Sequence, residues 1–175
     1  SAMSVRVGNR FAILLARDAV YPAPIAFHLA HELGHIFLGH LAEGTAIVDL
    51  ESLDELTTGN DPEEQQADAY ALETLTGRPQ IELVVQGEGR GARQLANEAI
   101  RVGQSERIEP GTVAMAFGHA TKAWATAMAS LPHIYQQPLD VWSVVNRIAL
   151  RQFALREIPD ESESFIRAVM GAPHD

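Results

Sequence analysis

The chain has 175 residues, a length that suits one domain with room for a small helical addition. Apolar residues make up 46% and charged residues 21%, which is typical of a folded globular protein and excludes a disordered chain. The sequence contains neither an apolar run of membrane-spanning length nor a basic-then-apolar leader. We therefore expect neither a membrane protein nor a secreted one, and take the cytoplasm as its compartment.

Cysteine is absent, which excludes a disulfide scaffold, a thiolate zinc site and a cysteine nucleophile. The formal net charge is −10, and Lys122 is the only lysine. The stretch from Asp18 to Gly77 holds 12 acidic residues and neither Lys nor Arg. A nucleic-acid-binding protein normally has a basic face, so that class is disfavoured. The acidic stretch either keeps the protein soluble or attracts cations or basic polypeptides.

The first predicted elements are a strand and a helix. Ser1 and Ala2, which precede Met3, have the character of a cloning remnant, and we set them aside. The apolar run 11–16 predicts a buried strand, and residues 18–23 predict a turn. A helix follows, with Pro24 in its first turn and Gly39 or Gly44 at its end. Its predicted core face consists of Ile25, Leu29, Leu33, Ile36 and Phe37.

The rest of the chain is mostly helical in prediction. Residues 45–60 are a polar, acidic connection without an assigned structure. Asp61 predicts a helix cap, Pro62 the first helical position and Gly77 the helix end. Residues 81–85 predict a short strand and the glycine-rich residues 87–91 a flexible loop. Further helices are predicted over 92–103, 110–130, 138–156 and 160–170, the last with a capping-box-like start at Asp160 and Glu163.

The string His31-Glu32-Leu33-Gly34-His35 carries the most specific chemical signal. Residues four apart share one face of a helix, so His31 and His35 can direct both imidazoles at one metal ion. Glu32 lies about 100° further around the helix axis, where it can reach a water on that ion and take its proton. Because such strings also arise by chance, the context matters. The surrounding helix is amphipathic, and Gly34 permits a second backbone to approach.

A second helix offers the ligand that two histidines leave missing, because catalytic zinc sites normally hold three protein ligands and a water. Glu64 and Asp68 lie four apart on one helical face. Glu64 can be the third ligand, Asp68 can accept a hydrogen bond from the outer N–H of a ligand histidine, and small Ala67 lets the helices approach. An ordinary acidic first turn is the alternative, because the helix dipole explains it without metal. The upstream histidines favour the metal site.

These residues resemble a known family, the ImmA/IrrE-like metallopeptidases. The likeness covers about residues 7–79 and rests on Phe27-His-Leu-Ala30, His31-Glu-Leu-Gly-His35 and Glu64-x-x-Ala67-Asp68-x-Tyr70-Ala71-x-x-x-Leu75. It implies a zincin fold, zinc on His31, His35 and Glu64, and Glu32 as catalytic base. It also implies a bacterial or phage protein inside the cell that cleaves or inactivates a repressor partner. His28 stands where the family often has threonine.

Two other histidines and one glycine motif compete for a role. A longer zinc motif places a third histidine six residues after the second and a glycine three after it, but Leu41 and Leu38 stand at these positions, so this subclass is rejected. His40 therefore either supports the ligands or lies on the surface. His28 shares the metal face of its helix and either lines the substrate cleft or is a partly buried histidine. Residues 87–92 nominally fit a dinucleotide fingerprint, but the second strand of a βαβ unit is missing.

The expected fold is α+β and zincin-like, with a small sheet, the HExxH helix, the glutamate-ligand helix and a mostly helical C-terminal half. We place the metallopeptidase core at residues 3–79 and a helical region at 80–175, packed on the same domain. The expected activity is zinc-dependent hydrolysis of a peptide bond in a protein or peptide, with neither nucleic acid nor membrane as a partner. Candidates for stabilising the oxyanion are His119, His133 and Tyr135.

The competing interpretation is a non-catalytic, metal-stabilised regulatory domain that binds a protein. An open fourth coordination position would indicate catalysis, whereas a filled one would indicate a structural metal.

Overall fold

The computed structural model describes residues 2–15, 19–42, 45–49, 61–78, 91–153 and 155–171. These residues belong to two compact units, Ser1–Pro138 and Leu139–Asp175. The first contains β1 (Ala2–Val7), β2 (Arg10–Leu15), α1 (Pro22–Leu38), β3 (Ala46–Asp49), α2 (Pro62–Thr76), α3 (Ala92–Glu106), α4 (Pro110–Thr121) and α5 (Trp124–Tyr135). The second contains α6 (Val141–Leu150), a 3₁₀ turn (Leu155–Glu157) and α7 (Asp160–Val169). The predicted α+β class, with a small sheet and mostly helical structure, is confirmed.

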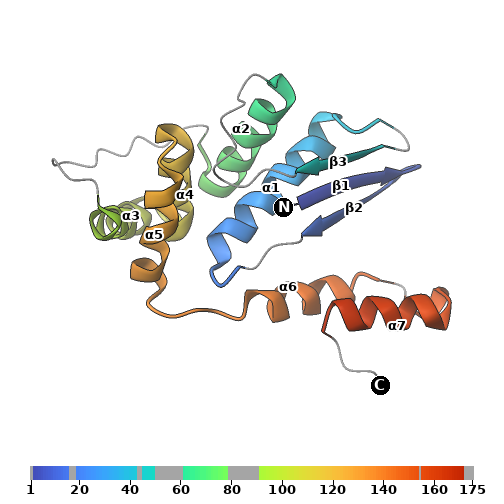
Figure 1. Ribbon diagram of the computed structural model, residues 1–175. Coiled ribbons are helices and arrows are strands. Elements are labelled where there is room, and N and C mark those ends of the chain that lie inside the picture. Colours follow the sequence, from blue (N-terminus) through green and yellow to red (C-terminus); the bar gives the residue numbers. More distant parts are fainter. Residues whose placement is uncertain are drawn as a thin grey trace. The chain divides into compact units, whose positions relative to one another are not determined.

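The three strands form an antiparallel sheet in the order β2-β1-β3, with α1 packed against β1 and β2 (Figure 1). The central strand β1 was not expected. Ala2, set aside in the sequence analysis, is buried as its first residue, and Ser4 is completely buried. Burial alternates along β1 as in any strand with one covered face. Because the buried positions carry Ala and Ser rather than large apolar residues, the alternation is invisible in a hydrophobicity pattern.

The strand expected at 11–16 is present as β2, but its expected burial is wrong. Phe11 is 45% and Leu14 50% exposed. Among the described strands, β2 is at the edge of the sheet and pairs with β1 alone, so an apolar run here does not imply a covered strand. The opposite edge strand, β3, lies in the segment that had no assigned structure.

Helix α1 has the predicted Pro24 in its first turn and ends at Gly39, which adopts the left-handed conformation with φ 80°. Its expected core face is wrong in part, because Leu29 and Phe37 are exposed. The buried face instead carries small and polar residues as well as Ile25 and Phe27. This face meets the sheet, α2 and α4. The buried face of α1 therefore includes the polar residues His28, His31, Glu32 and His35. The spacing of apolar residues in the sequence does not predict this face.

Helices α1 and α2 cross at Gly34 and Ala67. A Cβ atom added to Gly34 would lie 3.0 Å from Ala67 Cα and 3.1 Å from the Ala67 carbonyl oxygen. Ala67 is itself fully buried. This confirms the prediction that both small residues let the helices approach. Helix α2 also has its predicted ends, since the Asp61 side chain accepts a hydrogen bond from Glu63 N and Gly77 is the left-handed C-cap.

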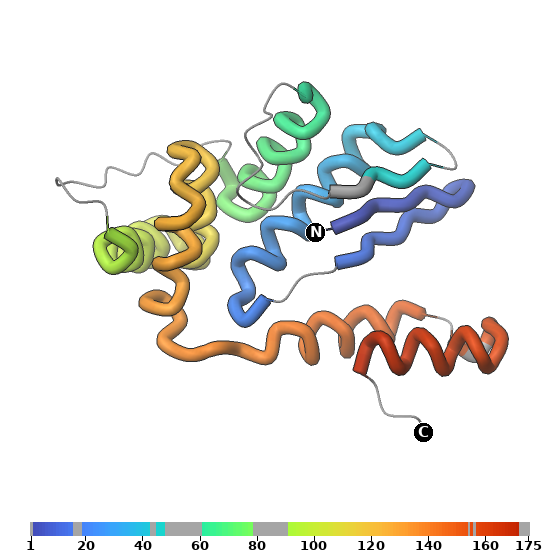
Figure 2. The backbone as a smooth tube through the Cα atoms, in the orientation of Figure 1, coloured from blue at the N-terminus to red at the C-terminus, as the bar shows by residue number. Residues whose placement is uncertain are grey.

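The helix predicted over 110–130 is two helices. α4 ends at Thr121, Lys122 adopts a left-handed φ of 57°, and α5 begins at Trp124. Gly118 leaves room for the indole, since a Cβ there would lie 2.9 Å from Trp124 Cε3. The return of the chain lets α5 pack on α3 and α4 (Figure 2). Their shared core includes Leu95, Ala99, Val113, Phe117, Ala127 and Leu131.

The second unit is a pair of helices. The helix predicted over 138–156 is shorter, ending at Leu150. Asp160 does not cap α7 as expected, because it is already the first helical residue after Pro159. Asn146 Nδ2 donates to the Met170 carbonyl and ties α7 to α6. Within the described parts of both units, no helix has the length and apolar character needed to cross a bilayer. The strand predicted at 81–85 and the loop over 87–90 lie outside the described residues.

Substituting Gly34→Ala tests the helix crossing. The new methyl group would press on the Ala67 backbone, so we expect the free energy of unfolding to fall by about 1–3 kcal/mol. Urea denaturation measures it. Gly91→Ser is the matched control, because Gly91 has a negative φ and nothing within 4 Å of an added Cβ. An unchanged stability of Gly34→Ala would show that the crossing accommodates the methyl group without the expected strain.

Candidate metal centre

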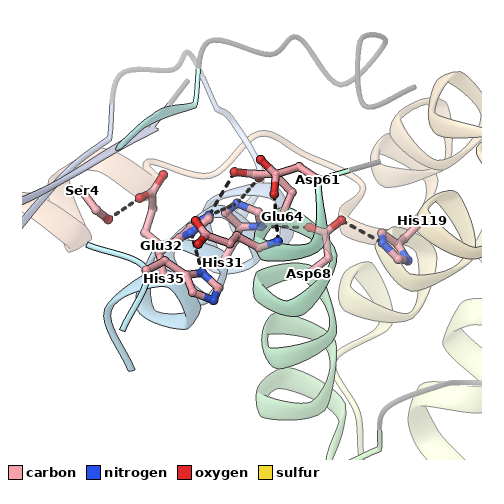
Figure 3. Close-up of polar contacts among 10 residues, drawn as sticks. Ser4, His31, Glu32, His35, Asp61, Glu64, Asp68 and His119 are labelled. Atoms are coloured by element: carbon pink, nitrogen blue, oxygen red, sulfur yellow. Dashed lines mark hydrogen bonds and ion pairs between the residues drawn. The ribbon is translucent and has the colours of Figure 1, made fainter. Parts of the chain in front are cut away.

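Three predicted ligands from α1 and α2 converge on one point (Figure 3). His31 Nε2 lies 3.1 Å from His35 Nε2 and 3.1 Å from Glu64 Oε2. His35 Nε2 lies 3.4 Å from Glu64 Oε1. Both histidines are buried, whereas the Glu64 side chain is 44% exposed. Within the described residues, the structure thus brings together a His-His-Glu group that can hold a metal ion.

The separations fit one cation between the three side chains. Zinc bonds imidazole nitrogen and carboxylate oxygen at about 2.0–2.1 Å, and tetrahedral ligands at that radius are about 3.3–3.4 Å apart. The 3.1 Å between the two Nε2 atoms is close to this edge length, and each histidine contacts one Glu64 oxygen, His31 at Oε2 (3.1 Å) and His35 at Oε1 (3.4 Å). With one ligand atom from each residue, all three atoms lie within 4.8 Å of one another. Two imidazole nitrogens that face each other at 3.1 Å also need a proton or a cation between them. The donor set and its spacing therefore fit a small divalent cation.

The outer nitrogen of His31 is held by Asp68. His31 Nδ1 lies 2.9 Å from Asp68 Oδ1. An ionised carboxylate only accepts hydrogen bonds, so Nδ1 must carry the proton, and in the neutral ring Nε2 is left with a lone pair aimed at the cluster. This is the role predicted for Asp68 from its position one turn after Glu64. The other oxygen, Oδ2, lies 3.0 Å from His119 Nε2.

The outer nitrogen of His35 is held by His40. The two Nδ1 atoms are 3.0 Å apart, and the backbone N–H of His40 donates to the His35 carbonyl. Gly39 makes this possible, because its left-handed conformation ends α1 and turns the chain back. Of the two alternatives for His40, the structure places it behind a ligand histidine. When His35 binds through Nε2, its Nδ1–H donates to His40 Nδ1.

The pKa values of His31, Glu64 and Asp68 are shifted by burial and by the contacts among the histidines and carboxylates of this cluster. Burial lowers the pKa of His31, but the carboxylates of Asp68 and Glu64 outweigh it and raise that pKa to about 10. Hydrogen bonds from His31 and His35 hold the pKa of Glu64 well below its usual range. Burial opposes ionisation of Asp68, but the hydrogen bonds from His119 and His31 lower its pKa to about 2. Both carboxylates are therefore ionised at neutral pH, as metal binding requires.

Glu32, the expected base, is completely buried and separate from the His-His-Glu group. The hydroxyl of Ser4 on β1 donates to Glu32 Oε2. In Figure 3 the Glu32 carboxylate points toward Ser4 and the Glu64 carboxylate toward the histidines. That Glu32 acts as a base and is no ligand stays a prediction. Sequence reasoning missed Ser4, which belongs to the unexpected strand β1.

The remaining expected site residues lie elsewhere. His28 is buried on α1 beside Phe27. Tyr135 donates its hydroxyl to Glu109 Oε1 at 2.8 Å, and burial together with this carboxylate raises its pKa. His133 is exposed on α5. None of these three belongs to the His-His-Glu group found among the described residues.

Comparisons with protein-family models, with curated proteins and with solved structures found no match for this chain.

Glu64→Gln tests the third ligand. A neutral amide is a poorer ligand than a carboxylate, so zinc affinity should fall by more than the roughly 10- to 100-fold that loss of an outer partner costs. Competition with a chromophoric chelator measures it. Glu63→Gln is the matched control, since Glu63 is adjacent and exposed. Equal affinities of the two variants would remove Glu64 from the ligand set.

The affinity for zinc should depend on pH. A cation binds His31 only after its proton leaves, and the pKa of His31 is about 10. Raising the pH therefore favours binding, by about tenfold per unit for one released proton. Chelator competition at pH 7.0, 7.75 and 8.5 checks the slope. A histidine of ordinary pKa would already be neutral over this range, so a flat profile would contradict the raised value.

Proposed function

We propose that the chain is a zinc-dependent metallopeptidase with a zincin-like site. The observation that carries this proposal is the convergence of His31, His35 and Glu64 at 3.1 to 3.4 Å, with Glu32 next to the first ligand but outside the group. Two imidazoles and one carboxylate are a ligand set of catalytic zinc, which leaves a fourth position for water or substrate. The resemblance of the two motifs to ImmA/IrrE-like metallopeptidases supports the same assignment.

Zinc in this site would supply a Lewis acid that polarises the scissile carbonyl and lowers the pKa of the attacking water. The residues of the chain supply the rest. Glu32 takes the proton of the water and returns it to the leaving amine. Ser4 orients Glu32 by donating to Oε2. Asp68 and His40 hold the ligand rings so that both Nε2 atoms stay aimed at one point.

The substrate in this proposal is a protein or peptide, and a repressor is the partner that the family resemblance suggests. The negative charge of the chain, −10 in total, favours a cationic segment over nucleic acid as its target.

One observation favours a second function. Glu32 is 0% exposed, and a general base must reach the water that it activates. If Glu32 stays covered with zinc bound, the site is a structural metal centre that stabilises a regulatory, protein-binding domain.

Glu32→Gln decides between these functions. Gln has nearly the same shape and cannot accept the proton, so the variant should bind zinc like the parent and lose hydrolysis. Zinc-loaded parent and variant are incubated with a peptide library, with and without chelator, and new termini are identified by mass spectrometry. Cleavage by the parent that both chelator and Glu32→Gln abolish supports the peptidase. Full zinc occupancy with no cleavage by either protein supports the regulatory domain.

A further inference from the structure

Helix α4 contacts the metal centre through His119, a residue outside the two motifs. The Asp68 carboxylate lies between two imidazoles, with Oδ1 2.9 Å from His31 Nδ1 and Oδ2 3.0 Å from His119 Nε2 (Figure 3). The Asp68 side chain is only 13% exposed and that of His119 24%. From the sequence, His119 is a candidate for stabilising an oxyanion. In Figure 3, however, Asp68 separates it from the ligand cluster.

The position of the His119 ring is fixed by aromatic neighbours. The Phe27 ring of α1 and the Trp124 ring of α5 have their centroids 6.4 and 6.3 Å from the His119 ring. Gly118, next to His119, leaves the space that the indole fills. These contacts from two other helices restrict the rotamers of His119 and direct its Nε2 at Asp68. The hydrogen bond is therefore built into the packing of α1, α4 and α5.

Each oxygen of the Asp68 carboxylate thus has a histidine partner, Oδ1 in His31 and Oδ2 in His119. Without His119, Oδ2 would lose this hydrogen bond while the Asp68 side chain stays largely buried. The carboxylate would then be free to rotate or to bind water. Either change moves Oδ1 relative to His31 Nδ1. The ring of His31 would then lose the partner that selects its tautomer and its orientation toward the metal.

We propose that His119 is a positioning residue of the metal centre, which fixes the Asp68 carboxylate and through it the His31 ring. This inference rests on the metal site of the proposed function and is independent of peptide hydrolysis. Through His119, helix α4, which packs on α3 and α5, would contribute to the metal centre. In the competing interpretation, the pair between His119 and Asp68 only stabilises the packing of α2 against α4.

The experiment measures zinc affinity by chelator competition in the full chain. We expect His119→Ala to bind zinc about 3- to 10-fold more weakly, since it acts one step beyond a partner worth roughly 10- to 100-fold. His119→Gln, whose amide can still donate to Asp68, should recover part of the affinity. His133→Ala is the matched control, because His133 is an exposed histidine of the same unit and should bind like the parent.

A double-mutant cycle tests whether His119 acts through Asp68. In an Asp68→Ala background, His119→Ala should cause no further loss of zinc affinity, whereas independent effects would add. The visible spectrum of bound Co²⁺ supplies a second measurement, which should change in His119→Ala because the geometry of His31 changes. Thermal unfolding of each metal-free variant shows that it is folded.

Three outcomes would overturn the inference. The first is a folded His119→Ala protein with unchanged zinc affinity and an unchanged Co²⁺ spectrum. The second is a double-mutant cycle in which the losses of zinc affinity add. The third is an Asp68→Ala protein that binds zinc as tightly as the parent. Failure of the parent to bind zinc would overturn the inference together with the whole metal site. Coupling between His119 and Asp68 without any peptide cleavage would support the inference and contradict only the hydrolytic function.

Discussion

The contact between Gly34 and Ala67 sets the distance between α1 and α2, and the candidate metal centre depends on that distance. Gly34 lies immediately before His35, and Ala67 lies immediately before Asp68. The backbone of Ala67 lies closer to Gly34 than an ordinary van der Waals contact with a side chain would allow, and Glu64 and Asp68 of α2 reach the histidines of α1. A larger residue at either position would move Glu64 and Asp68 away together. Ligand and support are thus positioned by one close packing contact.

The buried face of α1 serves the site at the expense of a larger apolar core. His28, His31, Glu32 and His35 are all buried, which requires that their polar atoms be satisfied. Asp68 and His40 satisfy the two outer imidazole nitrogens, and Ser4 donates to Glu32. Each of these partners comes from outside α1. The sheet, α2 and the turn after Gly39 are therefore all needed to satisfy the polar side chains on the buried face of α1. The interior of this unit is therefore organised around hydrogen bonds as well as apolar contacts.

The sequence predicted the parts of the site that depend on local geometry. The i, i+4 spacings of His31 with His35 and of Glu64 with Asp68, and the caps of α2, follow from the helical repeat and from backbone chemistry. It did not predict contacts that depend on tertiary packing. Ser4 lies on a strand without a hydrophobic signal, and the role of His119 depends on where α4 packs. The split of 110–130 into two helices depends on Trp124 folding back on Gly118, which periodicity alone does not encode.

The order of the chain gives the bond between Asp68 and His119 a consequence during synthesis. His119 lies 51 residues after Asp68, and ribosomes add about 5–20 residues per second. His31, His35, Glu64 and Asp68 therefore leave the ribosome roughly 3–10 s before His119. The residues that can hold a metal ion are thus synthesised before the helix that carries the second hydrogen-bond partner of Asp68. During this interval Asp68 Oδ2 lacks the His119 partner that it has in the folded unit.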